Sequence, residues 1–510
     1  MKNFDSSNSM AAHLAFLLLA VGVWGGDPMA LQRAVAAAIA SNTPSFTVAP
    51  GTYNFSTLPS HVPATLQIEN ATGFSLISGG AVEFIFPPVG GLRVTRSANV
   101  SLLGPFTIDA WPPFTTQGVV RGGVRSGKWF NFTLSLDPGF ELDARFIPSR
   151  AIFFDPATRR FLHGQSLCVT SALAAASLGN DAWAISVTFS CNPTLDVPDG
   201  SLCALTPTPG GPAVVIESSA RVAVSDLTSH AAAGFTLLEV GGAGGHTYTR
   251  FNAVRRPGSA RLMVSGADVF HSTAVAAGAV LSHSELSFAA DDLFAVHCEL
   301  GILWRRVNDT AFYVIDTSGT GGYGLPLAQP GDELYFYNMS LAMERVGVGV
   351  NVGRLAPVTN ATLVAEAEGA GDYIRRVLKL PMRNFSVNLL LVALEEPGLP
   401  LRDFGALVEL PSRCGAGTLV EASYLHDTNG GMRLKGSRVT VQNSVVENAY
   451  GMRMLPELYW TQSVSSNITL ANNVLRGCGC SANAPHAIAY PSDIVGLRLI
   501  NNSVLPKNCT

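Results

Sequence analysis

A short segment that recurs along the chain constrains the fold more than any other feature of the sequence. It has the pattern φ-x-φ-x-N-N-x-φ, where φ is apolar and the N positions hold Asn, Ser or Asp, and its clearest copies begin at Val439, Ile468 and Leu497, 29 residues apart. Weaker copies begin at Phe74, Val100, Val222, Thr247, Ala279 and Thr418. Period-2 strands that return at this spacing, with Asn and Gly at the corners, are typical of coils of a parallel β-helix. Leucine-rich repeats are the main alternative, but their fixed Leu spacing is absent.

The repeat is interrupted twice: the spacing of copies is 122 residues from Val100 to Val222 and 139 from Ala279 to Thr418, so about 100 residues beyond one coil are inserted each time. The inserted residues carry strand-like runs separated by Gly and Pro, which predict small β modules that grow out of loops. Ahead of the first coil, Asp27-Pro28 opens an Ala-rich stretch with an N-cap residue and a Pro at the first helical position. We therefore expect an all-β solenoid with a capping helix at its N-terminal end and two inserts.

The predicted organisation has six parts. In chain order they are a signal peptide at 1–26, the first β-helix part with the capping helix at 27–118, an inserted β module at 119–212, central coils at 213–300, a β-barrel-like insert at 301–408 and C-terminal coils at 409–510.

The N-terminus predicts secretion. An apolar run from Ala11 to Trp24 follows Lys2 and ends before Asp27, as in a signal peptide, although a buried N-terminal helix is the alternative. N-glycosylation sequons are spread over the whole chain, at Asn54, Asn70, Asn99, Asn131, Asn308, Asn338, Asn360, Asn384, Asn467, Asn501 and Asn508. We therefore expect a secreted, N-glycosylated protein with no membrane span after signal removal.

Composition and cysteine spacing exclude several classes. With 47% hydrophobic and 14% charged residues the chain is not disordered. A net charge of −4 without a basic run argues against a nucleic-acid partner. The eight cysteines form no C-x-x-C pair, so we expect no metal site and no cofactor. In an oxidising compartment Cys191 could pair with Cys203, and Cys478 or Cys480 with Cys509, but spacing does not fix the pairing.

A second strand of the repeat carries acids. Asp268 and Asp292 lie 24 residues apart, each two positions before a Phe, so we expect them in equivalent places of neighbouring coils, about 4.8 Å apart. Asp291 should point to the opposite side if its strand is regular. Stacked acids repel when ionised, which keeps a proton on the group and suits general acid and base roles. The structural alternative is that these acids sit at solvated corners or cap strands.

Other residues near these acids are candidates for sugar binding. His271 and His297 follow the acids by three and five positions, and Tyr459-Trp460 next to Glu457 could stack on a sugar ring. Packing or hydrogen bonding is the alternative for the histidines, and a buried aromatic pair is the alternative for Tyr459 and Trp460.

Five stretches along the chain form an ordered set: Ile108 to Gly118, Ala267 to His271, Ala290 to His297, Pro330 to Phe336 and Glu457 to Trp460. Taken together, they resemble the α-1,3-galactosidases of glycoside hydrolase family 110. The resemblance implies a right-handed parallel β-helix of the pectin-lyase type and an inverting exo-enzyme. It also implies that Asp268, Asp291 and Asp292 lie in the active cleft, with two of them acting as acid and base, and that Pro330 to Phe336 lies in an inserted β-barrel.

The chain also resembles polygalacturonases on the same solenoid, through the order Asp268, Asp291-Asp292 and Arg433-Leu-Lys435, although their Gly-His-Gly motif is missing. Arg433 is therefore a further candidate for substrate binding. Three hypotheses follow: a secreted glycoside hydrolase acting on a glycan of the α-galactoside type, a pectin hydrolase or polysaccharide lyase, and a non-catalytic solenoid that binds glycans. Oligomeric state is not predicted.

Overall fold

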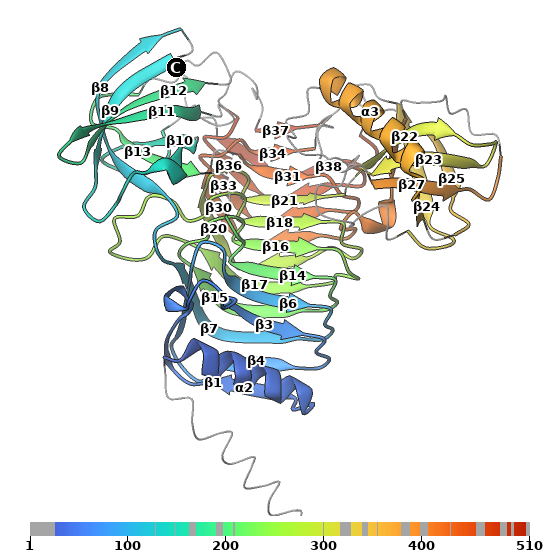
Figure 1. The fold of residues 1–510 in the computed structure, drawn as a ribbon, viewed down its shortest axis with the longest axis horizontal. Coiled ribbons are helices and arrows are strands. Elements are labelled where there is room, and N and C mark those ends of the chain that lie inside the picture. The colour runs from blue at the N-terminus through green and yellow to red at the C-terminus, as the bar shows by residue number, and fades with distance from the viewer. Residues whose placement is uncertain are drawn as a thin grey trace, which may run out of the picture.

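The computed structural model describes residues 26–505, except 128, 148, 163–169, 190–196, 208–209, 299, 317–327, 339–344, 354, 379–387, 398–405, 429, 455–464, 480–486 and 491–493. Most of these residues lie in β-strands, and two long parallel sheets run the length of the molecule (Figure 1). The predicted all-β class is confirmed. The predicted signal peptide lies outside the described residues except for Gly26. Within the described residues, no helix is both long enough and apolar enough to cross a membrane.

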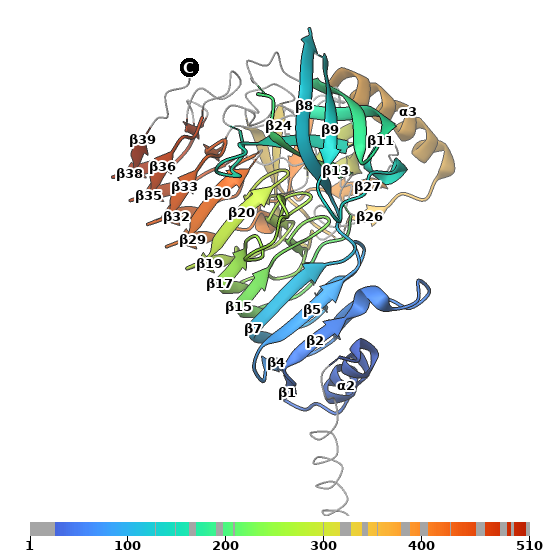
Figure 2. The ribbon, with the colours of Figure 1, turned by 90° about the vertical axis from the view of Figure 1, so that its left-hand side faces the viewer.

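The first parallel sheet has 17 strands among the described residues, arranged in two rows that share β7, β15 and β17 (Figure 2). Its strands are β1 Ser45–Val48, β2 Gly51–Asn54, β4 Ser75–Ser78, β5 Val82–Phe86, β7 Ser101–Ala110, β15 Ala223–Ser229, β17 Thr247–Ala253, β19 Val280–Ser282, β20 Glu285–Ala289, β29 Leu419–Glu421, β30 Tyr424–Thr428, β32 Thr440–Gln442, β33 Val445–Glu447, β35 Thr469–Ala471, β36 Val474–Arg476, β38 Arg498–Ile500 and β39 Ser503–Leu505.

The second parallel sheet has nine strands among the described residues. They are β3 Thr65–Glu69, β6 Gly91–Thr95, β14 Val214–Glu217, β16 Leu237–Val240, β18 Phe270–Thr273, β21 Phe294–His297, β31 Met432–Leu434, β34 Met452–Arg453 and β37 Ile488–Ala489. We call the two sheets together the stack.

The chain passes through the stack in a repeating order. A strand of each row and then a strand of the second sheet follow one another, as in β19–β20–β21, β29–β30–β31 and β32–β33–β34. Each strand pairs in parallel with its counterpart in the next repeat, for example β20 with β30 and β21 with β31. Residues of equivalent sequence position therefore lie one above the other, which decides which side chains meet.

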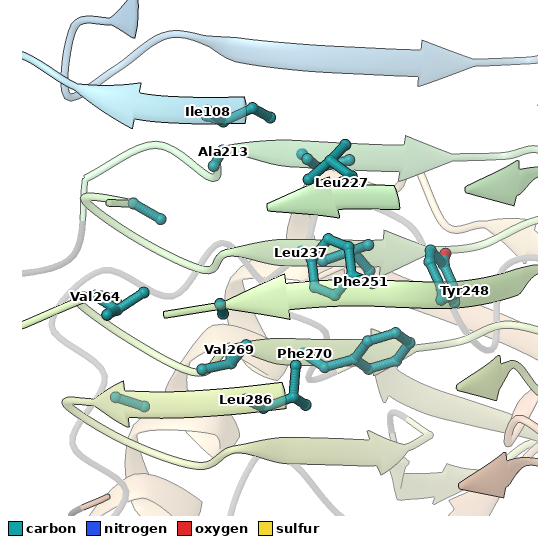
Figure 3. Close-up of a cluster of buried hydrophobic side chains, with 14 of the residues drawn as sticks. Ile108, Ala213, Leu227, Leu237, Tyr248, Phe251, Val264, Val269, Phe270 and Leu286 are labelled. Atoms are coloured by element: carbon teal, nitrogen blue, oxygen red, sulfur yellow. The ribbon is translucent and has the colours of Figure 1, made fainter. Parts of the chain in front are cut away.

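Apolar side chains fill the space between the sheets of the stack (Figure 3). Leu227, Leu237, Phe251, Phe270 and Leu286 come from successive strands of both sheets and are fully buried. We call each repeat of the stack a rung. Burying such a side chain contributes roughly 1.5–3 kcal/mol, and because these side chains pack against those of the next repeat, each rung is held mainly by the rungs on either side of it.

The Asn pairs of the sequence repeat form the corner between the two rows of the first sheet. The second position of each pair builds a buried ladder, in which Asn473 accepts a hydrogen bond from Ser444 N at 3.0 Å and donates one to Val441 O at 2.8 Å. In turn Asn502 Oδ1 accepts from Asn473 N at 3.1 Å. The first position takes a left-handed backbone conformation, with φ of 51° at Asn443, 56° at Asn472 and 48° at Asn501. Asn tolerates this conformation better than most residues, which explains the motif.

Helix α2, Pro28–Ala40, lies at the N-terminal end of the stack (Figures 1 and 2). The carboxylate of Asp27 accepts hydrogen bonds from the backbone N–H groups of Met29 at 2.8 Å and Ala30 at 3.0 Å, so Asp27 is the N-cap. Leu31 and Val35 are fully buried in the core of the stack. The helix therefore covers apolar residues of the first rung that would otherwise face water.

The first interruption of the repeat forms a closed antiparallel barrel. Its strands are β8 Thr116–Ser126, β9 Trp129–Leu136, β10 Ser149–Phe154, β11 Thr170–Gly179, β12 Ala182–Phe189 and β13 Leu202–Pro207. The barrel has a core of its own that includes Phe132, Phe153 and Val187. Cys203 also lies in this core as a free thiol, so the possible pairing of Cys191 with Cys203 is wrong, because Cys203 points into the barrel and is fully buried.

The second interruption forms a seven-stranded antiparallel sheet with one helix against it. The elements are β22 Leu300–Arg306, β23 Ala311–Asp316, β24 Glu333–Asn338, β25 Arg345–Val350, β26 Ala356–Pro357, α3 Ala361–Leu378, β27 Asn388–Ala393 and β28 Ala406–Glu409. A disulfide between Cys298 and Cys414 joins the chain just before β22 to the chain just after β28. The first insert leaves the stack after β7 and the second after β21, and the two lie on either side of the stack in Figure 1.

Candidate active site

Two of the predicted acids lie one above the other because of the strand register. Asp268 precedes β18 and Asp292 precedes β21, and these strands pair with Phe270 opposite Phe294. The backbone N–H of Val269 donates to Asp292 O at 2.9 Å, and Asp292 N donates to Asp268 Oδ1 at 3.2 Å. The 24-residue spacing in the sequence therefore corresponds to one rung of the stack.

Asp291 joins the same cluster. One side-chain oxygen from each of Asp268, Asp291 and Asp292 lies within 4.8 Å of the other two. The expectation that Asp291 points to the opposite side is therefore wrong, because Asp291 sits in the bend between β20 and β21, where strand alternation does not apply. The side chain of Asp291 is 34% exposed, whereas those of Asp268 and Asp292 are 8% and 4% exposed.

Each of the two adjacent acids has its own arginine. Arg433 on β31 places Nε 2.8 Å from Asp292 Oδ2, and Gly431 N donates to Asp292 Oδ1 at 3.0 Å. Arg150, from β10 of the barrel, places Nη1 2.9 Å from Asp291 Oδ2. A Cβ atom at Gly430 would collide with Asp292 Oδ1, so this position requires a residue without a side chain.

The surroundings shift the pKa values of the two adjacent acids in opposite directions. Burial raises the pKa of Asp292 to about 7; Arg433 opposes this shift, and the charges of Asp268 and Asp291 add to it. Burial also acts to raise the pKa of Asp291, but the charges of Arg150 and Arg433 outweigh burial and hold it below its usual value. A protonated acid therefore lies beside an ionised one near neutral pH, which is the arrangement that acid–base catalysis needs.

Two buried histidines hold Asp268 in place. His271 Nδ1 lies 2.6 Å from Asp268 Oδ2, and its Nε2 lies 3.0 Å from His297 Nε2. His297 Nδ1 faces the carbonyl oxygen of Cys298 at 2.6 Å, with Thr273 Oγ1 at 3.5 Å. A carbonyl only accepts, so Nδ1 of His297 carries its proton, and Nε2 of a neutral His297 accepts from His271.

The protonation of His297 agrees with this network, because burial and the nearby charge of His271 lower its pKa well below the usual value. His271 is 5% exposed and His297 1% exposed. Both were predicted to contact substrate, but the structure engages their ring nitrogens within the protein. Their role in this geometry is to orient the carboxylate of Asp268.

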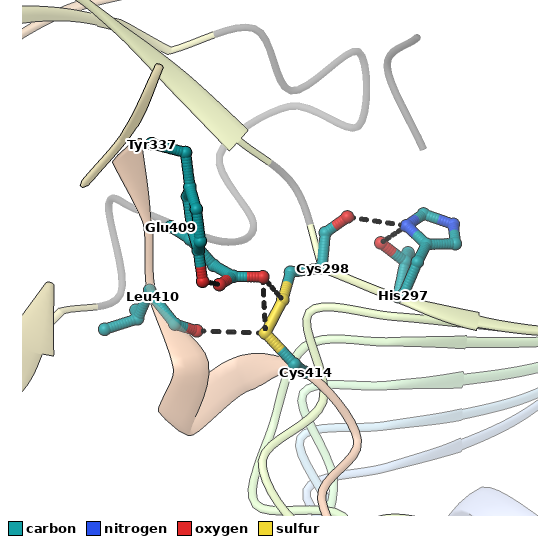
Figure 4. The surroundings of a disulfide bond; sticks show 7 residues. His297, Cys298, Tyr337, Glu409, Leu410 and Cys414 are labelled. Carbon is teal, nitrogen blue, oxygen red and sulfur yellow. Dashed lines mark hydrogen bonds between the residues drawn. A yellow bond between two sulfur atoms is a disulfide. The ribbon is translucent and has the colours of Figure 1, made fainter. Parts of the chain in front are cut away.

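His297 also links the acids to the base of the second insert (Figure 4). It adjoins Cys298, whose disulfide to Cys414 packs against the buried carboxylate of Glu409. Tyr337 donates a hydrogen bond to Glu409 Oε2 at 2.5 Å. Neither this disulfide nor its contact with Glu409 was predicted from the sequence, because Cys298 and Cys414 are 116 residues apart.

The remaining predicted residues divide between the site and undescribed segments. Arg433 contacts the acid cluster, whereas Glu457, Tyr459 and Trp460 lie outside the described residues. Arg150 was not predicted, because no pattern in the sequence of an inserted strand indicates that one of its side chains reaches the stack. The Gly430-Gly431 pair was a usable signal, since two glycines before a repeat strand indicate close backbone approach.

Three carboxylate oxygens this close could also hold a divalent cation. Arg150 and Arg433 already place positive charge against two of these acids, which reduces the attraction for a metal ion. At the second group of potential ligands, Cys298 and Cys414 are joined as a disulfide and so offer no thiolate beside Glu409.

Comparisons with known proteins give only distant similarities. No protein-family model matches this chain, and no curated protein matches it. Among solved structures, the chain is similar to the catalytic unit of a thermostable GH87 alpha-1,3-glucanase from Streptomyces thermodiastaticus strain HF3-3, with a TM-score of 0.33 and 9% identity over 95% of this chain and 54% of that chain. It thus spans about half the length of that structure.

Two further structures have lower TM-scores. The Agl-KA catalytic domain gives a TM-score of 0.21 at 9% identity, covering 94% of this chain and 65% of that one. The gp54 tailspike of Acinetobacter baumannii bacteriophage AP22, in complex with a capsular saccharide, gives 0.14 at 8% identity, covering 93% and 76%. Similarity at this level carries no argument about chemistry, so function is argued from the acid cluster itself.

Proposed function

We propose that this chain is a secreted, N-glycosylated glycoside hydrolase on a right-handed parallel β-helix, with Asp292 as general acid and Asp291 as general base. The observation that carries the proposal is the contrast between these two adjacent acids. Asp292 is buried with a pKa raised to about 7, while the partly exposed Asp291 is held ionised by Arg150. Asp268 and His271 support Asp292 from the rung next to it. The proposed substrate is a terminal α-galactoside, which follows from the family resemblance of the motifs.

The mechanism begins with a proton on Asp292. Asp292 donates this proton to the glycosidic oxygen as the bond to the leaving group breaks, and Asp291 accepts a proton from the attacking water. Above about pH 7 Asp292 loses its proton, so kcat/KM should fall there. Gly431 N and Arg433 remain in contact with Asp292 and stabilise the carboxylate that proton donation leaves behind.

The spacing of the acids bears on the stereochemical course. Inversion usually needs carboxyl groups about 6.5–9.5 Å apart and retention about 5–5.5 Å. The three acids here have oxygens within 4.8 Å of one another, so the inversion predicted from the family resemblance requires substrate or water to separate them. Proton NMR of the anomer that is released first measures the course directly.

Matched substrates test the two roles. The assay uses nitrophenyl α- and β-glycosides, α-galactoside first, and disaccharides with the same glycone. Asp292→Asn should lower kcat/KM by about 10²–10⁴-fold on disaccharides and much less on nitrophenyl substrates, which need little protonation of the leaving group. Asp291→Asn should lower kcat/KM by the same factor on both kinds of substrate. Asp181→Asn, at an exposed turn of the barrel, is the control. Equal turnover of the Asp292→Asn and wild-type proteins would contradict the role of Asp292.

One observation favours a non-catalytic glycan-binding solenoid as the second candidate. Asp291 and Asp292 each contact an arginine and Asp268 contacts a histidine, and such a charge-balanced cluster can be purely structural. This candidate predicts that the protein binds glycan without turnover, and that Asp291→Asn leaves this binding unchanged. Unsaturated products that absorb in the ultraviolet, released from a uronate polymer, would instead indicate a lyase.

A further inference from the structure

One hairpin of the inserted barrel reaches the acid cluster. Strand β10 begins at Ser149, ends at Phe154 and turns through Asp155 to Arg160, and Phe161 then bridges back to Phe154. Arg150 lies at the start of this hairpin and Arg160 at its end. Each arginine contacts an acid of the stack, so the hairpin is held at two points ten residues apart in the sequence.

The Arg160 end is fixed by a dense set of contacts. Arg160 Nε lies 2.8 Å from Asp427 Oδ2, and its Nη1 lies 2.6 Å from Glu447 Oε1. The backbone N–H of Phe161 donates to Asp427 Oδ1 at 3.3 Å, and Asn448 donates to the same oxygen at 2.6 Å. The side chain of Asp427 is fully buried, so this contact belongs to the packed interior and is costly to break.

Apolar packing fixes the middle of the hairpin. The rings of Phe154 and Phe161 meet edge to face at 4.9 Å, and both side chains belong to the core of the stack. Phe161 also contacts Phe288 of β20, and the guanidinium of Arg255 lies 3.4 Å above the Phe288 ring. In Figure 1 the barrel lies beside the edge of the stack that carries β20 and β30. The barrel is therefore docked rigidly enough to position one side chain accurately.

The side chain positioned in this way is Arg150. Its Nη1 lies 2.9 Å from Asp291 Oδ2 and donates to Ala290 O at 2.8 Å, so one nitrogen contacts both the acid and the backbone beside it. We propose that Arg150 is a positioning residue that keeps Asp291 ionised beside Asp292, and that the inserted barrel is thereby part of the catalytic site. The kinetic part of this inference rests on the proposed glycosidase function.

The groups that face Asp291 define what removing Arg150 should do. They are the cations Arg150 on β10 and Arg433 on β31, His271 on β18, and the acids Asp268 and Asp292. Without Arg150 the two other acids and burial act against one fewer cation, so Asp291 takes up its proton at a higher pH. A base must be ionised to act, and the low-pH limb of the activity profile should therefore move upward.

The test compares Arg150→Gln with Arg150→Lys. Arg150→Gln should shift the low-pH limb of kcat/KM upward by about 1–3 pH units, the effect typical of a neighbouring arginine. Because a single nitrogen of Arg150 makes both contacts, the amine of Arg150→Lys can replace it and should restore the limb to within about half a unit. Arg145→Gln, at an exposed arginine of the same barrel, is the matched control and should leave the profile unchanged.

A second readout does not depend on turnover. Infrared difference spectra between each protein and its Asp291→Asn counterpart report when Asp291 is ionised, and Arg150→Gln should move this titration to higher pH. If the wild-type protein is inactive but the titration moves, the proposed function fails and the positioning role stands. A titration and a profile that both stay in place in folded Arg150→Gln protein, or a loss of kcat alone that Arg150→Lys does not restore, would overturn the inference.

Discussion

At the scale of single residues, the acid cluster shows how position decides protonation between neighbours in the sequence. Asp291 and Asp292 have the same side chain, yet that of Asp292 is buried in the stack, while that of Asp291 reaches solvent and contacts Arg150. A pKa raised by burial is also a stability term, because a carboxyl that stays protonated in the folded protein binds more protons than in the unfolded chain.

The first prediction concerns the pH dependence of stability. The folded pKa of Asp292 is about 7 against an ordinary value of 3.8, so the folded protein binds the extra proton between these two pH values. The unfolding free energy should therefore fall by up to about 1.4 kcal/mol per pH unit as pH rises from about 4 to about 7. Urea unfolding of the wild-type and Asp292→Asn proteins across this range measures how the unfolding free energy depends on pH. The contribution of Asp292 to this dependence should be absent in the variant.

Asp291 is separated from this effect by its pH window, and the other titrating groups are separated from it by a control. The lowered pKa of Asp291 adds stability that is lost only as pH falls below about 4, outside the window of Asp292. Asp181→Asn should keep the wild-type slope, because Asp181 is exposed in a turn of the barrel. Identical slopes for wild type and Asp292→Asn would argue against a raised pKa at Asp292.

At the scale of elements, the paired asparagines of each corner do different work. Asn473 is fully buried, and its side chain bonds two backbone groups of the preceding rung, whereas its neighbour Asn472 is exposed and takes a positive φ. One position is chosen for its side-chain hydrogen bonds and the other for its backbone conformation. The sequence pattern alone treats the two as equivalent.

The second prediction contrasts these adjacent positions. Asn473→Ala removes the side-chain partner of the N–H of Ser444 and of the carbonyl of Val441, and it should lower the unfolding free energy by about 2–5 kcal/mol. Asn472→Gly fits the left-handed conformation and should change it by less than about 1 kcal/mol. Urea unfolding of both variants measures this contrast. Equal losses would mean that the ladder in the turn contributes little.

At the scale of the whole molecule, each insert is restrained by contacts between residues that are far apart in the sequence. The barrel is held through Arg150 and Arg160, and the second insert is closed at its base by the disulfide between Cys298 and Cys414. This disulfide restrains a loop of more than one hundred residues, and the entropy that closing such a loop removes from the unfolded chain is worth several kcal/mol.

The third prediction follows from that closure. Reduction should lower the melting temperature of the oxidised protein and make the second insert more sensitive to proteolysis, because the covalent link between its two ends is lost and the pairing of β22 with β28 is left to hold them. The free energy of unfolding should fall by about 2–5 kcal/mol on reduction. A Cys298→Ser and Cys414→Ser double variant should already show the lower melting temperature and should not respond to reductant. A response that persists in this variant would point to other cysteines.

Much of the fold was predictable from the sequence. Alternating apolar residues and recurring Asn corners specify strands and turns directly, and Asp27-Pro28 specifies the start of the capping helix, because these signals are local. The register of Asp268 with Asp292 followed from their own 24-residue spacing and their matching positions before Phe270 and Phe294. The orientation of Asp291 did not, because a bend between β20 and β21 breaks the alternation on which the expectation depended.

The sequence by itself determined the repeating strands, their corners and the alignment of acids one rung apart, since each depends on a short-range pattern that recurs along the chain. Only the tertiary structure decided which cations neutralise these acids. Arg150 lies 141 residues before Asp291, and it arrives through the docking of a separate barrel whose contacts with Asp427 and Phe288 leave no periodic trace in the chain. Contacts between independently folded modules depend on shape and packing, which no local pattern encodes.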